Sequence, residues 1–182
     1  KYRSLLIENA VAEDEEMLER YLEVGEEGLT EAEIRTAIRR AILQGKFYAV
    51  TGGDGRGVIV EKVLDLVVDL LPSPLDRGET WGEHPKTGDK VERKPEESEP
   101  FAGLAFKIAT DPFVGKLAYF RVYSGKLAAG SYILNSSTGE KERVGRIVRM
   151  QADKREDVTE VSAGDIAAIV GLKGTTTGNT LC

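Results

Sequence analysis

Histidine and cysteine, two residue types that commonly carry catalysis or bind metals, are scarce in this chain of 182 residues. His84 and Cys182 are its single histidine and single cysteine. A zinc site takes three or four Cys, His or carboxylate ligands, and a nucleophilic triad needs a histidine held beside its nucleophile. Acidic pairs such as Glu156 and Asp157 have no nucleophile or electrophile to act on. We therefore predict no catalytic residue and no metal ligand in this chain.

Four glycines among residues 52–57 form a run that could approach a phosphate group. A phosphate-binding loop of the Walker A type ends in Gly-Lys followed by Ser or Thr, and this run does not. The dinucleotide pattern Gly-x-Gly-x-x-Gly also fails, because Val58 occupies the third glycine position. The residues alone therefore favour a flexible turn between a strand and a helix.

The basic residues are unevenly distributed. Residues 1–100 carry 14 Lys and Arg against 23 Asp and Glu, a net charge of −9, and residues 101–182 carry 11 against 8, a net charge of +3, which sum to −6. Basic side chains can contact RNA phosphates, but ordinary solvated surfaces also reach an excess of this size. Both interpretations stay open for eight residues of the second half: Lys107, Lys116, Arg121, Lys126, Lys141, Arg143, Arg146 and Arg149.

Aromatic residues accompany these basic positions. Tyr119, Phe120, Tyr123 and Tyr132 could stack on nucleic-acid bases. Aromatic residues in strands more often pack in a core or against a cross-strand neighbour, and we expect that role for these four.

The first 74 residues must position the glycine run, and their pattern is mainly helical. Apolar spacing predicts a helix over 5–22. Thr30 and Glu33 fit a capping box at the start of a second helix, which Gly45 ends. Residues 47–50 predict a short buried strand, and 63–71 predict a third helix that Pro72 stops. Because one strand cannot form a sheet, we interpret 1–74 as the C-terminal part of an α/β domain whose other strands precede it.

The rest of the chain changes in character. Residues 75–100 are rich in Pro, Gly, Lys and Glu, and predict a linker with a short hairpin at 90–93. From Phe101 onward, turn signals such as Asp111–Pro112 and Ser124–Gly125 separate short strands, which favours an antiparallel β-barrel over 101–182. The predicted fold class is therefore α+β. The predicted strands are 101–109, 116–123, 131–135, 141–150 and 165–172.

The run from Asp111 to Gly130 has the pattern Asp-x-x-x-Gly-x-Leu-x-x-x-Arg-Val-x-Ser-Gly-x-Leu-x-x-Gly. This pattern resembles the second domain of translational GTPases, and most closely that of elongation factor G. The Leu-Pro-Ser-Pro sequence at 71–74 resembles the end of that family's G domain, and Gly57–Val58 matches as well. The chain departs from the family at Gln151, where histidine is usual.

This resemblance implies the C-terminal part of a G domain, a linker and a translation-factor β-barrel. The complete protein would bind GTP or GDP with Mg²⁺ and hydrolyse GTP on the ribosome to drive movement of tRNA and mRNA. The phosphate-binding and switch motifs would precede this chain, so we expect neither catalysis nor a cofactor in the piece alone. The resemblance places Thr51, Gly52 and Gly53 near the guanine base, although the family's Ser-Ala pair is missing there. It predicts contacts with small-subunit rRNA at Lys116, Arg121, Lys126 and Arg143.

Two alternatives remain from the sequence. The altered glycine loop could mark a ribosome-protection protein or another paralogous translational GTPase. The basic and aromatic residues would also suit a stand-alone RNA-binding barrel. We expect a cytoplasmic monomer without a membrane span, because no apolar stretch reaches about 18 residues.

Overall fold

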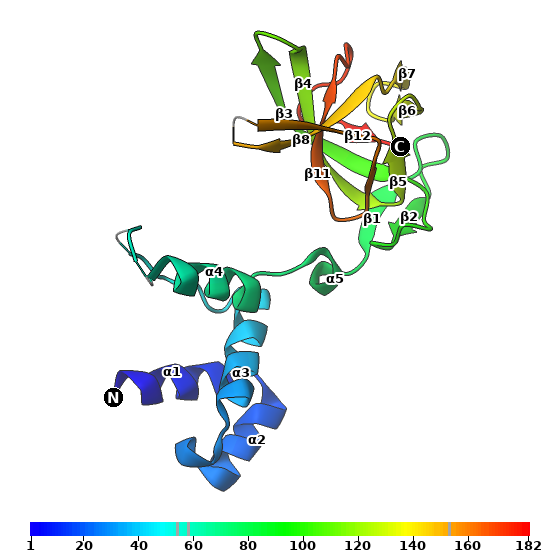
Figure 1. Cartoon of the computed structure of the whole chain (residues 1–182). Helices are drawn as coiled ribbons and strands as arrows, with labels where there is room; N and C mark the ends of the chain where they lie inside the picture. The colour runs from blue at the N-terminus through cyan, green and yellow to red at the C-terminus, as the bar shows by residue number, and fades with distance from the viewer. Residues whose placement is uncertain (54, 58, 153) are drawn as a thin grey trace. The chain divides into compact units, whose positions relative to one another are not determined.

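The computed structural model describes residues 1–53, 55–57, 59–152 and 154–182. Asp54 and Val58, which belong to the sequence motifs above, and Asp153 lie outside the described residues. The chain divides into two compact units, Lys1–Pro72 and Ser73–Cys182 (Figure 1).

Unit 1 is helical throughout its described secondary structure. Its elements are α1 (Tyr2–Val11), α2 (Glu15–Val24), the 3₁₀ turn η1 (Glu26–Gly28), α3 (Glu31–Leu43) and α4 (Ile59–Leu70). Ile7, Ala10, Met17, Ile34 and Ala37 belong to its buried core, which joins the first three helices. No described helix in either unit has the length and hydropathy needed to cross a membrane.

The predicted helix over 5–22 was wrong, because the chain forms two helices there. Asp14 ends the connection and starts α2 as its N-cap, and its side chain accepts a hydrogen bond from the Met17 amide at 3.1 Å. Glu15 and Glu16 follow in the first turn, where carboxylates oppose the positive end of the helix dipole. The apolar spacing continues across the break, so periodicity did not reveal it.

The predicted second helix was correct at both ends. The Thr30 side chain accepts a hydrogen bond from the Glu33 amide at 3.3 Å, and the Glu33 carboxylate accepts one from the Thr30 amide at 2.7 Å. Gly45 has φ +74° after the end of α3, and Lys46 N–H donates to Ala41 C=O at 2.9 Å. These bonds complete the capping box and a glycine-based C-terminal cap.

The predicted buried strand at 47–50 was wrong. Tyr48 and Val50 are 85% and 94% exposed, and the segment pairs with no other strand among the described residues. A strand depends on hydrogen bonds from a neighbouring strand, and unit 1 provides none in the described part. The predicted third helix exists as α4, although it begins earlier than expected and ends at Leu70, just before Pro72.

Unit 2 begins with a one-turn helix and a hairpin. Ser73 caps α5 (Pro74–Arg77), and β1 (Thr80–Glu83) pairs antiparallel with β2 (Lys90–Arg93). The hairpin predicted at 90–93 therefore exists, with 80–83 as its partner. The segment 75–100, expected to be a linker, contains the hairpin and all of α5 except Pro74.

The remaining strands of unit 2 form antiparallel sheets. The largest has the order β7-β6-β12-β3-β4-β11-β8-β9, and β5 pairs with β10. The mixed helical and antiparallel architecture agrees with the predicted α+β class. The strands are β3 (Ala102–Asp111), β4 (Gly115–Ser124), β5 (Lys126–Ala128), β6 (Tyr132–Asn135), β7 (Glu140–Arg143), β8 (Arg146–Gln151), β9 (Lys154–Val158), β10 (Glu160–Ser162), β11 (Ile166–Val170) and β12 (Thr180–Leu181).

The single strand predicted at 141–150 was wrong, because the chain changes partners at Val144 and Gly145. Val144 is fully buried, its amide bonds to Ser131, and β8 then pairs with β11 rather than β6. Sequence patterning also missed β5, β9, β10 and β12. Those strands are short, and β9 is highly charged, so neither length nor apolar alternation marks them.

Inward-facing side chains from several strands form one main core in unit 2. Phe120, Ile133, Ile147, Ile169 and Leu181 are each 0–1% exposed and belong to the same buried cluster. Phe120 packs edge-on against Phe101, with 6.4 Å between ring centroids. Burial of these side chains from several strands ties the sheets together, because removal of apolar surface from water is the main stabilising contribution.

Gly125 meets a steric requirement that the sequence pattern alone does not reveal. Its φ is +70°, and a Cβ placed there would lie 2.4 Å from Glu99 O and 2.6 Å from Phe101 N. The backbone of residues 99–101 therefore passes directly over this glycine. Gly130 also has a positive φ, +86°, but a Cβ placed there would meet nothing within 4 Å.

We predict that Gly125→Ala destabilises the chain much more than Gly130→Ala. Positive φ costs roughly 1–2 kcal/mol at either position, and steric overlap adds about 1–3 kcal/mol at Gly125. Urea unfolding followed by circular dichroism measures both free energies of unfolding. Equal losses in the two variants would contradict the close approach.

Candidate nucleic-acid interface

The predicted guanine-proximal loop is an exposed segment. Thr51, Gly52 and Gly53 are all exposed. A Cβ on Gly52 would meet nothing within 4 Å, whereas one on Gly53 would lie 2.3 Å from Ile59 Cγ2. A side chain on Gly53 would thus force Ile59 to shift, whereas Gly52 lies in open space. Thr51, Gly52 and Gly53 therefore do not by themselves enclose a purine base.

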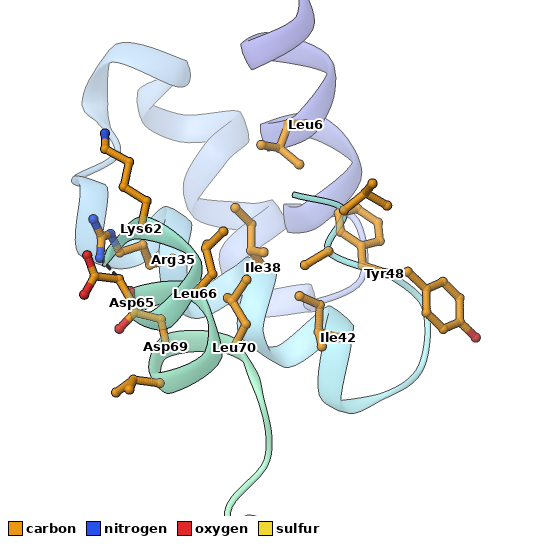
Figure 2. A pocket seen from close by; sticks show the side chains of 14 residues that line it. Leu6, Arg35, Ile38, Ile42, Tyr48, Lys62, Asp65, Leu66, Asp69 and Leu70 are labelled. Carbon is orange, nitrogen blue, oxygen red and sulfur yellow. Dashed lines mark hydrogen bonds and ion pairs between the residues drawn. The ribbon is translucent and has the colours of Figure 1, made fainter. Parts of the chain in front are cut away.

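A groove of about 750 Å³ lies elsewhere in unit 1, between α1, α3, α4 and residues 47–50 (Figure 2). Ile38, Leu66 and Leu70 project into it, and Arg35 lies at its edge beside Asp69 at 2.8 Å (Figure 2). Thr51, Gly52 and Gly53 do not line this groove. The predicted nucleotide loop therefore follows residues 47–50 in the chain but contributes no lining residue to this groove.

Two of the four predicted rRNA contacts are engaged inside unit 2. Lys116 Nζ donates to Lys173 O at 3.0 Å and to Thr175 O at 2.7 Å. Lys126 Nζ lies 2.7 Å from Glu97 and 3.5 Å from Glu160. Both ammonium groups would have to give up these partners, or share them, to contact a phosphate.

The other two predicted contacts differ in accessibility. Arg121 is half-buried on β4, and Arg143 is exposed on β7. Neither side chain has a hydrogen bond or ion pair within the described ranges. Arg143 is therefore the accessible cation of the predicted set.

The hairpin of β6 and β7 brings an aromatic ring to Arg143. Tyr132 pairs directly with Arg143, and Leu134 pairs with Lys141. Directly paired residues share one face of an antiparallel ladder, as do residues two apart. Tyr132 is 68% exposed, and Lys141 and Arg143 are exposed beside it. We call Tyr132, Lys141 and Arg143 the Tyr132 face; across the described residues, no side-chain partner occupies any of them.

Glu142 fixes which way this hairpin faces. It lies between Lys141 and Arg143, so strand alternation turns it to the opposite side. Its carboxylate accepts hydrogen bonds from Lys173 N–H at 2.6 Å, Gly174 N–H at 3.0 Å and Thr175 Oγ1 at 2.6 Å. We call this arrangement, together with Lys116, the Glu142 clasp.

Asn135 extends the clasp into the interior. Its side-chain amide donates to Asn179 Oδ1 at 3.0 Å, and its oxygen accepts from the amides of Ser137 and Thr138. Asn135 and Thr175 are fully buried. Every hydrogen bond here satisfies a group whose burial would otherwise be costly, so the loop 173–179 is held firmly against β6 and β7.

The clasp also sets the charge state of Glu142. Burial by itself would raise the pKa of Glu142, but hydrogen bonds from Thr175, Gly174 and Lys173 and the nearby Lys116 charge together hold that pKa below its usual range. The unfolded chain therefore takes up this proton at a higher pH than the folded chain does. The resulting stabilisation is present above the ordinary Glu pKa and is lost as pH falls through the folded value.

We predict that Glu142→Gln lowers the free energy of unfolding at pH 7 by about 1–3 kcal/mol, because buried donors lose an ionised acceptor. The difference from the parent chain should shrink as pH falls through the folded pKa. Glu140→Gln is the matched control on the same strand, since no hydrogen bond to the Glu140 carboxylate occurs among the described residues. Urea unfolding across the acid range measures both variants, and a loss independent of pH would contradict the ionised clasp.

The aromatic residues have divided roles. Phe120 is fully buried, as expected for a core residue, and Tyr119 packs against Phe106 with 6.4 Å between ring centroids. Tyr132 contradicts the core or cross-strand expectation in part, because most of its surface is open. Its place at the end of an edge hairpin, which the sequence does not specify, leaves the ring uncovered.

The sequence analysis missed a second aromatic and cationic contact, at the turn between β3 and β4. Phe113 is 85% exposed, and the Arg155 guanidinium lies 5.7 Å from its ring centroid. Asp111 Oδ1 accepts from the Phe113 and Val114 amides and pairs with Arg155 at 2.9 Å. The Asp-Pro turn signal indicated this turn, but the partner in β9 is remote in sequence.

The single histidine and the single cysteine are both exposed residues of unit 2. His84 Nδ1 lies 3.3 Å from the Thr87 amide in the exposed β1–β2 turn, and Cys182 is exposed after β12. Within the residues that the structure describes, no group of three or more His, Cys, Asp or Glu could hold a metal ion.

Comparison with known proteins finds a match for residues 100–182, which belong to unit 2. The family model described as elongation factor G domain 2 matches residues 100–182. A crystal structure of a protein from Thermus thermophilus matches with a TM-score of 0.72 and 27% sequence identity over 99% of this chain. The chain spans 24% of the length of that solved chain. Residues 100–182 are therefore a translation-factor domain.

Proposed function

We propose that this chain, whose residues 100–182 form a translation-factor domain, is part of an elongation-factor-G-type translational GTPase. The complete protein would act in the cytoplasm, bind GTP or GDP with Mg²⁺, and use GTP hydrolysis on the ribosome to move tRNA and mRNA. The match over 100–182 is the observation that supports this proposal most directly. The described piece would contribute ribosome contact and would scaffold the G domain.

The Tyr132 face is the surface that suits this role. Lys141 and Arg143 are exposed cations without described partners, and RNA phosphates would release counterions on binding them. Tyr132 lies directly opposite Arg143, where an unstacked base could lie on its ring. Contacts of this kind give position and salt-dependent affinity rather than sequence recognition.

We predict that Arg143→Gln weakens binding of the chain to small ribosomal subunits and reduces its salt dependence. Loss of one phosphate contact lowers the slope of log affinity against log salt by about 0.7–0.9. Tyr132→Ala should cost about 1–3 kcal/mol if its ring stacks on a base. Sedimentation with purified subunits at several salt concentrations measures both effects.

Lys107→Gln is the matched control, because it also removes one exposed charge from unit 2. Lys107 lies on β3, where its ammonium group sits over the Tyr119 ring and away from the Tyr132 face. This control should bind like the parent chain. Equal weakening by Arg143→Gln and Lys107→Gln would contradict the Tyr132 face as the contact. Binding to any RNA with the same affinity as to ribosomal subunits would favour the stand-alone RNA-binding barrel instead.

We predict that the purified chain releases no phosphate from GTP and Mg²⁺ above the buffer rate. Its glycine run lacks the Lys and hydroxyl residue that a Walker A loop uses on phosphates and Mg²⁺. A phosphate-release assay over many hours measures this rate. Turnover by the chain alone would contradict the assignment of catalysis to other parts of the complete protein.

A further inference from the structure

Unit 2 contains a pocket that the ribosome proposal does not use. It has a volume of about 370 Å³ and lies between the β1–β2 hairpin and strands β3, β4 and β12. This volume falls within the range of about 300–1,000 Å³ typical of small-molecule sites. The pocket shares no lining residue with the Tyr132 face.

Strand alternation determines which side chains of the hairpin turn toward the barrel. Thr80 pairs with Arg93 and Gly82 pairs with Val91, so these four share one face. Thr80, Val91 and Arg93 are half-buried and line the pocket. Trp81 and Glu83, at the alternate positions, are exposed and also line the pocket, and Glu92 is half-buried. The face with Thr80, Val91 and Arg93 therefore borders the pocket, and the Glu83 carboxylate lies at its rim.

The barrel supplies a mainly apolar wall with polar edges. Leu104 and Tyr123 line the pocket and are half-buried, while their neighbours Ala105 and Val122 turn into the core. Ser136 and Thr180 also line it, and Ser136 Oγ donates to Thr180 O at 3.2 Å. The Ser136 hydroxyl oxygen therefore keeps its acceptor capacity.

Arg93 is the charged group on the barrel-facing side of the hairpin. Its Nη1 donates to Glu92 O at 3.0 Å, and it forms no ion pair with any described carboxylate. A guanidinium carries five N–H donors in a fork that fits phosphate or carboxylate oxygens. A partly desolvated cation without a counter-charge is costly, and an anionic ligand would compensate it.

We propose that this pocket binds a nucleoside monophosphate, either free or as one unstacked nucleotide of an RNA strand. The Tyr123 ring and Leu104 pack against the base, and Arg93 pairs with the phosphate. Thr80, Ser136 and Thr180 offer hydroxyl groups to the ribose. The apolar, cationic and hydroxyl groups of the pocket thus match the base, the phosphate and the ribose of a nucleotide.

Cys182 provides a direct readout, because it is the single cysteine of the chain, is exposed and lines the pocket. The rate of its reaction with Ellman's reagent is measured while AMP, GMP, CMP or UMP is added. We expect at least one of these to slow the reaction saturably. The matching nucleoside and inorganic phosphate should each bind about tenfold more weakly, since each lacks a charge-assisted or stacking contact.

Arg93→Gln should weaken this protection about tenfold, because it removes the charge-assisted contact to phosphate. Lys90→Gln is the matched control: it removes the same charge from the same hairpin, but Lys90 lies on the opposite face, 4.2 Å from the Trp81 ring centroid. Tyr123→Leu keeps the charge and should reduce the preference for a nucleotide over inorganic phosphate. Circular dichroism melts confirm that each variant is folded.

Short single-stranded RNA is tested beside the mononucleotides to identify the source of the ligand. Protection by mononucleotide supports a free ligand, and protection by RNA at concentrations where mononucleotide gives none supports a strand-borne nucleotide. No protection by either at millimolar concentration would overturn the proposal. Equal effects of Arg93→Gln and Lys90→Gln, or equal protection by nucleoside and nucleotide, would also overturn it. The purified chain is used without ribosomes, so these outcomes do not depend on the ribosome proposal.

Discussion

The ionised clasp at Glu142 is the constraint on which the arrangement of unit 2 depends. One carboxylate accepts two backbone amides and one hydroxyl from the loop 173–175, and Lys116 holds the carbonyls of the same loop. Strand alternation then leaves Lys141 and Arg143 on the outside with Tyr132. The interior polar contact and the exposed cationic surface are therefore two consequences of one strand register. A shift of β7 by one residue would exchange them.

Pairing inside the domain, rather than formal charge, separates the engaged cations of unit 2 from the open ones. Lys116 is held by carbonyl oxygens and Lys126 lies between two carboxylates. Arg143 has the same formal charge and no such partner in the described structure. The net charge of residues 101–182 therefore does not show which cations are accessible. Several of these cations are already paired within the fold.

In unit 1, some apolar side chains are left exposed. Helix α4 has a strongly apolar sequence, yet Leu64 and Val68 are 59% and 77% exposed, and Leu70 is its buried residue. The groove in Figure 2 runs along this helix and residues 47–50, of which 48–50 are exposed. The interpretation of 47–50 as a strand came from composition that suits a sheet, and a strand needs hydrogen-bonding neighbours that the described residues of unit 1 do not supply.

The sequence by itself determined the local features: the capping box at Thr30, the glycine cap at Gly45, the turns at Asp111–Pro112 and Ser124–Gly125, and the antiparallel character of the second half. These depend on the conformational limits of one residue or on bonds between residues a few positions apart, so their signals are contiguous. Only the tertiary structure decided that Lys116 is engaged and Arg143 is open, that the run 141–150 divides at Val144, and that Arg93 faces a pocket with Tyr123. Those outcomes depend on contacts between segments separated by tens of residues, such as Glu142 with Thr175, and no local pattern encodes which distant groups will meet.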